Sequence, residues 1–209
     1  MNLRALTYLD DLNPEAMPVQ HSYPSRLEAE VDSLKAQLER MRAYITDLER
    51  AADTDPLLPI YNRRAFMREL VRAQYMYDRL EIASCVVFLD LNNFKAINDR
   101  YGHAMGDKML REVGNVLLNG VRGEDTVARL GGDEFGVLLL KTDPDVAKSK
   151  AEALSRKISE ISVDMPTESV TVTAAWGVAS CNTGNDAEAI LSRADQNMYA
   201  AKRRGQCVH

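Results

Sequence analysis

The run IASCVVFLDL at residues 82–91 constrains the fold of this chain more than any other feature of its sequence. It is a short apolar run rich in β-branched residues, without the polar alternation of a strand that has one face in water. It therefore predicts a buried strand at the centre of a sheet that is covered on both faces. Asp90 is the exception in this run, because a buried carboxylate that stays charged and unpaired is unfavourable. We expect Asp90 to emerge at the edge of the sheet, to gain a partner, or to be functional.

Patterns elsewhere in the chain predict the elements that surround this strand. TVARL and FGVLLL, joined by GGDE, predict a hairpin, and residues 169–180 predict a later strand. Helices are expected over residues 61–80, from Asn92 or Asn93 onward, and over residues 105–120, 144–162 and 186–204. From residue 82 onward the order is β, α, α, β, β, α, β, α, which predicts an α/β fold with a mixed sheet flanked by helices.

A heptad repeat precedes this domain. Its apolar residues alternate at spacings of four and three: Leu27, Val31, Leu34, Leu38, Met41, Ile45, Leu48 and Ala52. The spacing predicts a coiled-coil helix, and Val31 and Ile45 at a with leucine or methionine at d favour a parallel homodimer through residues 26–52. Glu30 at g would pair with Lys35 at the following e of the partner helix. A single helix packed on its own domain, an antiparallel pair and a four-helix arrangement are the alternatives.

Prolines divide the chain into three parts. Residues 1–25 contain three prolines and have mixed polarity, which is typical of an irregular leader with at most one short helix. The two prolines of DTDPLLP, residues 53–59, end the heptad helix. We therefore expect a leader over residues 1–25, a dimerising helix over residues 26–53 and one domain over residues 54–209.

Composition argues against several classes of protein. The net charge is −5, the pI is about 5.3, and no basic stripe suggests a nucleic-acid groove, so no nucleic acid is expected as a partner. Three cysteines without metal-ligand spacing give no disulfide framework and fit a reducing cytosol. The chain lacks the basic region and apolar stretch of a signal peptide, and no run approaches the length of a transmembrane helix. We expect a cytoplasmic protein without membrane insertion.

The GGDE turn carries two acids whose proximity to Asp90 needs an explanation. If the hairpin lies beside the 82–91 strand, Asp133 converges on Asp90, and the two carboxylates repel each other. A divalent cation removes that repulsion, and oxygen ligands with room for phosphate oxygens point to Mg²⁺ or Mn²⁺ rather than zinc. Gly131 and Gly132 would let the turn take φ > 0 and let a ligand approach the backbone. The alternative is a glycine-rich type I′ turn with solvated acids.

The segment LDLNNFKAINDRYGHAMGDKML places a strand end, a tight turn and a helix start in succession. Backbone N–H groups at Asn92 to Lys95 would receive phosphates, as helix N-termini do. Asn98 and Asp107 carry the donors and acceptors that read a purine edge, since an aspartate accepts from the N1–H and exocyclic amine of guanine. Each residue has an ordinary alternative: a solvated helix residue for Lys95, a helix-surface residue for Asn98, a helix N-terminal charge for Asp107 and a partner of a loop carbonyl for His103.

The stretches DLNNFKAINDRYGHAMGD and RLGGDEFGVLL, at their spacing, resemble the GGDEF-domain diguanylate cyclases from about Asp55 to Gln206. The resemblance implies the palm-like α/β fold of nucleotidyl cyclases and polymerases, a ferredoxin-like sheet flanked by helices. It implies condensation of two GTP into cyclic di-GMP with release of two pyrophosphates, with Mg²⁺ or Mn²⁺ as cofactor and two ions per active site. Each protomer would hold one GTP, so two sites must face each other in a homodimer.

The same resemblance assigns roles to individual residues. Asp90 and Asp133 would bind the metal through their side chains and Leu91 through its carbonyl, while Asp133 or Glu134 would help to deprotonate the attacking 3′-hydroxyl. Asn98 and Asp107 would bind guanine, and Leu57 would pack on the base. Phe94 and Lys95 would contact phosphates, and Lys202 would reach the terminal phosphates. His103 would line the substrate site.

RGED, residues 122–125, matches the RxxD inhibitory site of the family, with five residues between it and Gly131. Arg122 would grip the phosphate or guanine of bound cyclic di-GMP, and Asp125 would take the guanine edge. The resemblance therefore implies product inhibition. The alternative is an exposed turn with a local ion pair.

The chain departs from the family pattern in three places. Leu58 and Pro59 replace the threonine and glycine of the usual DxLTGLxNRR, which predicts a stiffer turn between coiled coil and domain. Asn93 stands where an aromatic residue or histidine is common, and Gln206 replaces an arginine, which would lower phosphate affinity. Because the metal acids and guanine readers are intact, an active cyclase is the main hypothesis. The alternative is a catalytically silent module that binds GTP or cyclic di-GMP as a regulator; an adenylyl-type cyclase or polymerase palm is disfavoured by the GGDEF sequence.

Overall fold

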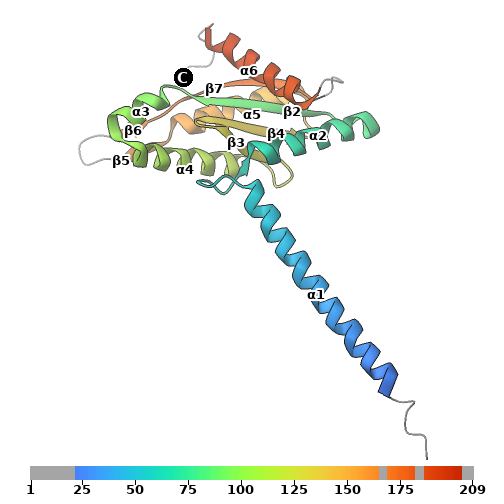
Figure 1. Ribbon diagram of the computed structural model, residues 1–209. Coiled ribbons are helices and arrows are strands. Elements are labelled where there is room, and N and C mark those ends of the chain that lie inside the picture. The colour runs from blue at the N-terminus through green and yellow to red at the C-terminus, as the bar shows by residue number, and fades with distance from the viewer. Residues whose placement is uncertain (1–21, 165–168, 182–185, 204–209) are drawn as a thin grey trace, which may run out of the picture. The chain divides into compact units, whose positions relative to one another are not determined.

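The computed structural model describes residues 22–164, 169–181 and 186–203 (Figure 1). Residues 1–21 of the expected leader lie outside this part. Helix α1 (Ser22–Asp53) begins at Ser22 rather than at residue 26, and Pro24 falls in its first turn, where a missing N–H is tolerated. The chain divides into two compact units between Arg50 and Ala51.

The first unit contains most of α1, whose heptad residues form an open apolar stripe. Their side chains are 42–65% exposed in the single chain: Leu27, Val31, Leu34, Leu38, Met41, Ile45 and Leu48. Lys35 lies 3.7 Å from Asp32 of its own helix, so its expected pairing with Glu30 across a dimer stays a prediction. None of the helices in the described ranges is both long enough and apolar enough to cross a membrane.

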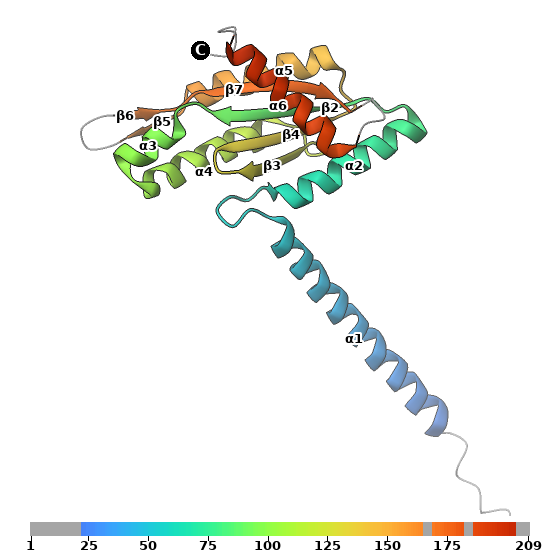
Figure 2. The ribbon, with the colours of Figure 1, turned by 45° about the horizontal axis from the view of Figure 1, so that its top comes forward.

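The second unit is built on a five-stranded sheet in the order β1-β3-β4-β2-β7 (Figures 1 and 2). Its strands are β1 (Tyr61–Asn62), β2 (Ser84–Leu91), β3 (Thr126–Gly131), β4 (Glu134–Leu140) and β7 (Ala174–Ser180). β2 lies between β4 and β7 and is antiparallel to both, whereas β1 runs parallel to β3. The mixed sheet with the 82–91 run as an interior strand is therefore confirmed.

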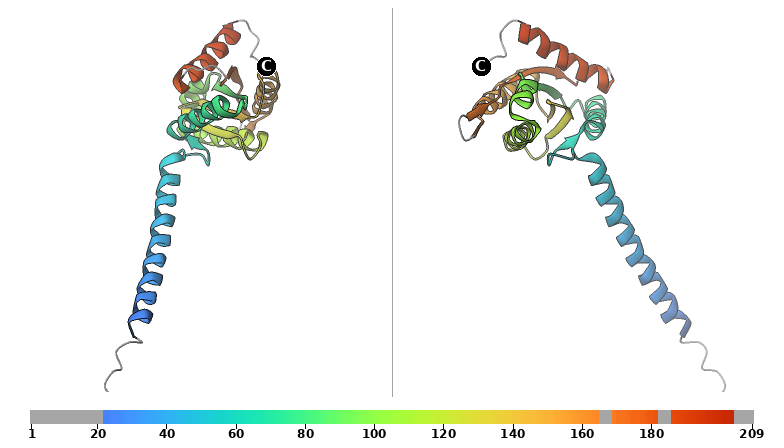
Figure 3. Two further views of the ribbon diagram at one scale, coloured as in Figure 1. Left: turned by 90° about the vertical axis from the view of Figure 1, so that its right-hand side faces the viewer. Right: turned by 60° about the vertical axis from the view of Figure 1, so that its left-hand side comes forward.

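Helices cover both faces of this sheet (Figure 3). One face packs on α4 (His103–Gly120) and α5 (Pro144–Ser159), with α3 (Phe94–Tyr101) beside α4; the other packs on α2 (Arg63–Leu80) and α6 (Ala187–Arg203). Along β2, Val87 and Leu89 belong to the first core and Val86 and Phe88 to the second. Because side chains of a strand alternate between faces, Asp90 lies on the face covered by α2 and α6.

A cluster of polar groups holds the last residues of α1 against the start of α2. The buried Asp53 accepts hydrogen bonds from Arg68 at 2.7 Å and from Arg64 at 3.1 Å, and the contact with Arg68 is the main reason that the pKa of Asp53 is lowered. The Ala52 carbonyl accepts from Asn62 at 2.7 Å and from Arg64 at 2.9 Å. Asn62 and Arg64, which the chain shares with the DxLTGLxNRR pattern, therefore hold residues 52–53 at the start of α2.

The structure differs from the predicted elements in three places. Residues 61–62 form β1 rather than the start of a helix, because they pair with β3. The helix expected over residues 144–162 ends at Ser159, and residues 162–164 form β5, which pairs with β6 (Ser169–Thr171) in a separate two-stranded sheet. The strand expected over residues 169–180 is therefore divided into β6 and β7. Between them the Thr173 carbonyl accepts from the Asn92 N–H at 2.8 Å, which draws the chain toward the start of α3.

Candidate active site

Three acidic residues, Asp90, Asp133 and Glu134, lie where β2 ends beside the turn of the β3–β4 hairpin. Asp90 lies directly opposite Glu134 in the antiparallel ladder, so the two side chains project from the same face of the sheet. The Leu91 N–H donates to the Asp133 carbonyl at 3.2 Å, which holds the turn beside the end of β2. Asp90 and Asp133, far apart in the sequence, therefore lie at the same end of the sheet.

The surroundings raise the pKa of two of these acids. Burial is the main cause that raises the pKa of Asp133, and the charge of Asp90 raises it further. Burial also raises the pKa of Glu134, with like-charge repulsion from Asp90 and then Asp133 adding to it. Both shifts mean that the charged form of each acid is less stable here than in water, and a nearby cation would relieve this.

Lys202, near the end of α6, supplies one positive charge at this place. Its Nζ lies 2.9 Å from Asp90 Oδ1. The approach is possible because α6 packs very closely on β7: a Cβ atom at Gly177 would overlap the main chain of Ala194 and Met198. Lys202 was expected at the terminal phosphates of the substrate, and the structure places it on an acid expected to bind the metal.

The donors at this end of the sheet fit a hard divalent cation. The carboxylates of Asp90 and Asp133 and the carbonyl of Leu91 are oxygen ligands, the kind that Mg²⁺ and Mn²⁺ prefer. Among the residues that the structure describes, no three His, Cys, Asp or Glu side chains converge to enclose a metal ion.

The turn between β3 and β4 is not of type I′. Gly132 has a φ of +29°, but neither Gly131 nor Asp133 has a positive φ, and a type I′ turn needs one at both central residues. The turn therefore takes its positive φ at Gly132 and not at Gly131. That residue ends β3, next to a shift of register that begins at Arg129.

Arg129 is a residue of the site that the sequence analysis did not single out. Its Nε and Nη2 donate to the Gly132 carbonyl at 2.9 and 2.7 Å, and its Nη1 lies 3.5 Å from Asp55 Oδ1. Asp55 in turn accepts from the N–H groups of Leu57 and Leu58. Arg129 therefore connects the carboxylate turn to the loop that carries Leu57. An arginine inside an otherwise apolar strand was the signal that could have identified it.

The residues expected to bind the nucleotide lie on α3, on α4 and in the loop before β1. Phe94 and Lys95 are the first two residues of α3, and the N–H groups of the next two donate to the Asn93 carbonyl. The Phe94 ring is buried in the core. Asn92 was expected to offer its N–H to phosphate; this was wrong, because that group donates to Thr173. Asn98, Asp107 and Leu57 are half-buried, while His103 is exposed at the start of α4.

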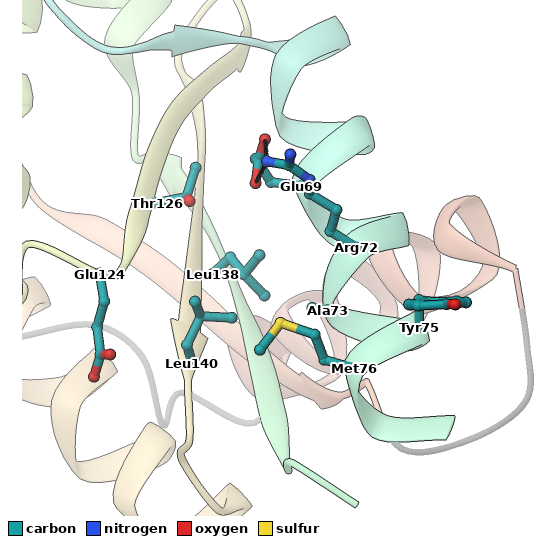
Figure 4. A pocket seen from close by; sticks show the side chains of 9 residues that line it. All are labelled: Glu69, Arg72, Ala73, Tyr75, Met76, Glu124, Thr126, Leu138 and Leu140. Atoms are coloured by element: carbon teal, nitrogen blue, oxygen red, sulfur yellow. Dashed lines mark hydrogen bonds and ion pairs between the residues drawn. The ribbon is translucent and has the colours of Figure 1, made fainter. Parts of the chain in front are cut away.

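The RGED turn is held in place by Asp125. Its Oδ2 accepts from the Arg122 N–H at 2.9 Å and its Oδ1 from the Leu140 N–H at 3.1 Å. The bond between Arg122 and Asp125 thus uses the main chain of the arginine, whose side chain is exposed. Glu124 of this turn lines a groove of about 380 Å³ between α2 and the β3–β4 strands (Figure 4). Arg122 and Asp125 lie together on a structured turn.

Known proteins are similar to this chain over most of its length. Residues 52–207 match the family described as "Diguanylate cyclase, GGDEF domain". Over 204 residues, 96% of this chain, it is 30% identical to diguanylate cyclase DgcP of Pseudomonas aeruginosa and 28% identical to diguanylate cyclase VdcA of Vibrio cholerae. It spans 30% and 59% of the length of these two relatives, respectively. The crystal structure of the coiled coil and GGDEF domain of DgcB from Caulobacter crescentus, in complex with c-di-GMP, is similar with a TM-score of 0.76 and 30% identity, over 86% of this chain and 96% of that one.

Proposed function

Because the chain belongs to the family of GGDEF-domain diguanylate cyclases, we propose that it condenses two GTP into cyclic di-GMP with release of two pyrophosphates. The observation that carries the proposal is the ladder that sets Asp90 opposite Glu134, with Asp133 in the adjoining turn. GTP is a cytoplasmic substrate, and we place the reaction in the cytoplasm.

In this reaction the carboxylate end of the sheet would hold the metal and accept a proton. Asp90, Asp133 and the Leu91 carbonyl would hold Mg²⁺ or Mn²⁺, with two ions per active site, which neutralise charge on the attacking and leaving oxygens. Asp133 or Glu134 takes the proton of the 3′-hydroxyl as the general base.

The rest of the machinery positions the nucleotide. Asn98 and Asp107 bind guanine, Leu57 packs on the base, the first turn of α3 with Phe94 and Lys95 holds phosphate, and His103 lines the site. Lys202 would reach the terminal phosphates on leaving the 2.9 Å ion pair that its Nζ makes with Asp90. Most of the catalysis then comes from orientation and charge neutralisation, as phosphoryl transfer requires.

The proposed activity needs a dimer, because each protomer holds only one of the two GTP molecules. We propose that the exposed stripe of α1 pairs with the same stripe of a second copy, which brings two loaded half-sites together at high effective concentration.

Leu34→Asp, at a d position, is expected to convert the dimer into a monomer and to lower activity at least tenfold at low protein concentration, because a charge would be buried in the seam. Ala36→Asp, on the opposite face of the same helix, is the control and leaves both properties unchanged. Light scattering measures the molecular mass, and the rate of product formation measures the activity. A Leu34→Asp protein that stays dimeric and active would contradict the coiled-coil proposal.

We also propose that cyclic di-GMP binds at Arg122 and Asp125 and inhibits the enzyme. Arg122→Ala removes the guanidinium but keeps the turn, whose bonds to Asp125 use the main chain. The inhibition constant of added cyclic di-GMP should therefore rise at least tenfold, while the initial rate stays close to that of the unmodified protein. The rate is measured against product concentration, and unchanged inhibition would exclude RGED as the inhibitory site.

The proposed function itself is tested by incubating the purified protein with GTP and Mg²⁺ and identifying the products by mass spectrometry. Cyclic di-GMP and pyrophosphate in a ratio of one to two are expected. Binding of GTP or cyclic di-GMP by a folded dimer without any turnover would instead support a silent regulatory module.

A further inference from the structure

The Asn98 side chain lies directly over Gly106 of the neighbouring helix α4. A Cβ atom added at Gly106 would overlap Asn98 Oδ1, and it would lie 3.0 Å from Asn98 Cγ and 3.1 Å from Phe94 Cζ. Gly106 is buried, and α3 and α4 pack against each other at this point. The missing side chain at Gly106 therefore provides the space that the Asn98 amide fills.

The helix itself does not require glycine at this position. Gly106 does not have a positive φ, and its N–H donates to the Gly102 carbonyl at 3.4 Å, as a helical residue does. Alanine is more favourable than glycine within a helix, so helix preference alone would select alanine. The close approach of the Asn98 side chain explains why residue 106 is glycine.

The collision that a side chain at residue 106 would cause falls on the end of a flexible side chain. Rotation of the Asn98 amide away from α4 would remove most of it, and the Phe94 ring would need to move by only a few tenths of an ångström. A side chain at residue 106 should therefore disturb the packing of the fold only slightly, but it should change the direction in which the Asn98 amide points. In the described part of the chain, the Asn98 amide makes no hydrogen bond to protein that would restore this direction.

From this geometry we infer that Gly106 is a positioning residue for guanine specificity. It seats the Asn98 amide against α4, the helix that carries Asp107 as its next residue, and in the proposed complex these two side chains read one purine edge. Asn98 and Asp107 touch the base, and Gly106 acts only through Asn98. This inference rests on the proposed function, because it takes Asn98 and Asp107 as the guanine contacts.

Gly106→Ala and Gly114→Ala form a matched pair that tests the inference in the full-length protein. Gly114 is also a buried glycine of α4, but a Cβ there would make only ordinary contact, 3.6 Å from Leu58 Cδ1. Both substitutions gain the same helix propensity. The readout is the equilibrium binding, by calorimetry with Mg²⁺, of α,β-methylene analogues of GTP and ATP, which cannot undergo attack with loss of pyrophosphate.

Gly106→Ala should lower the preference for the GTP analogue over the ATP analogue about tenfold, the effect of one or two hydrogen bonds to the base. Gly114→Ala should leave the preference unchanged, and both variants should fold. Asn98→Ala should lower the preference to a similar degree, and adding Gly106→Ala to it should have little further effect, because the two act through one contact. A purely structural role would weaken both analogues equally and leave the ratio unchanged.

Three results would overturn the inference: an unchanged preference in Gly106→Ala, a large further loss in the double variant, or unfolding of Gly106→Ala while Gly114→Ala folds. The last result would mean that the collision falls on the packing rather than on the amide. If the unmodified protein itself does not prefer the GTP analogue, the proposed function fails and the inference fails with it. The two failures are distinguishable, since the first appears in the unmodified protein and the second only in the variants.

Discussion

Asp133→Asn is expected to abolish the synthesis of cyclic di-GMP, with a loss of roughly a thousandfold or more, while the domain stays folded. The Asp133 carboxylate lies in the hairpin turn beside Asp90, where it would bind the metal that neutralises the reacting oxygens. Asparagine keeps the shape of the side chain but removes its charge. The turn itself is held by the Asp133 and Gly132 carbonyls, which the substitution leaves in place.

Without added metal, the same variant is expected to change how the stability of the domain depends on pH. Burial and the charge of Asp90 raise the pKa of Asp133 above its ordinary value of 3.8. A carboxyl group with a raised folded-state pKa favours folding fully below its unfolded-state pKa, and this contribution is lost as the pH rises through the folded-state pKa. Asp133→Asn removes this loss of stability at rising pH. As the pH is raised from 4 to 7, the melting temperature of the variant should therefore fall less than that of the unmodified protein.

Melting curves across pH and a product assay at saturating GTP check this pair of expectations. Glu112→Gln, at an exposed acid of α4, is the control for loss of one negative charge and should leave both activity and pH dependence unchanged. Full activity of Asp133→Asn would show that the metal assignment is wrong. A melting temperature far below that of the unmodified protein at neutral pH would show that Asp133 has a structural role.

Arg129→Ala is expected to destabilise the domain by about 2–3 kcal/mol and to lower activity by one to two orders of magnitude. The Arg129 side chain is 17% exposed and that of its partner Asp55 is 11% exposed, so the variant leaves a mostly buried carboxylate without its counter-charge. It also removes both hydrogen bonds to the Gly132 carbonyl. The carboxylate turn and the loop that carries Leu57 then lose the residue that links them.

Arg63→Ala is a matched control for the loss of an arginine in an ion pair. Arg63 lies 3.0 Å from Glu188, but these side chains are 48% and 65% exposed, so the loss should be below about 1 kcal/mol. Urea unfolding gives the free energies, and initial rates give the activity. Asp55→Ala together with Arg129→Ala should destabilise less than the sum of the single changes. Additive losses, or equal losses for Arg63→Ala and Arg129→Ala, would contradict the proposed link.

Much of the fold was predictable because its signals are local. The β-branched run before Asp90 predicted an interior strand, and the apolar segments on both sides of GGDE predicted the hairpin; the structure contains both. The errors arose where pairing with a distant segment decides the outcome. Residues 61–62 form a strand because β3 lies beside them, and the 169–180 run is divided because Thr173 bonds to Asn92.

In the candidate site, too, local signals were predictable and contacts between distant segments were not. That acids of the 82–91 run and the GGDE turn would meet could be inferred once the hairpin was placed beside the strand. Which neighbours surround them could not be inferred, because Lys202 is 112 residues from Asp90 in the sequence and Arg129 is 74 residues from Asp55. Nor does any local pattern show that Gly106 must be small to seat Asn98, since that requirement belongs to the packing of α3 on α4.

By itself, the sequence determined the periodicities, the order of the elements and the identity of the chemical groups at GGDE and in the segment after Asp90. The tertiary structure alone decided which of these groups compensate one another: Lys202 on Asp90, Arg129 between Asp55 and Gly132, and Asn98 over Gly106. The physical reason is that hydrophobic periodicity acts within a single element, whereas charge pairing and steric fit depend on distances between elements that only the packed sheet and helices define.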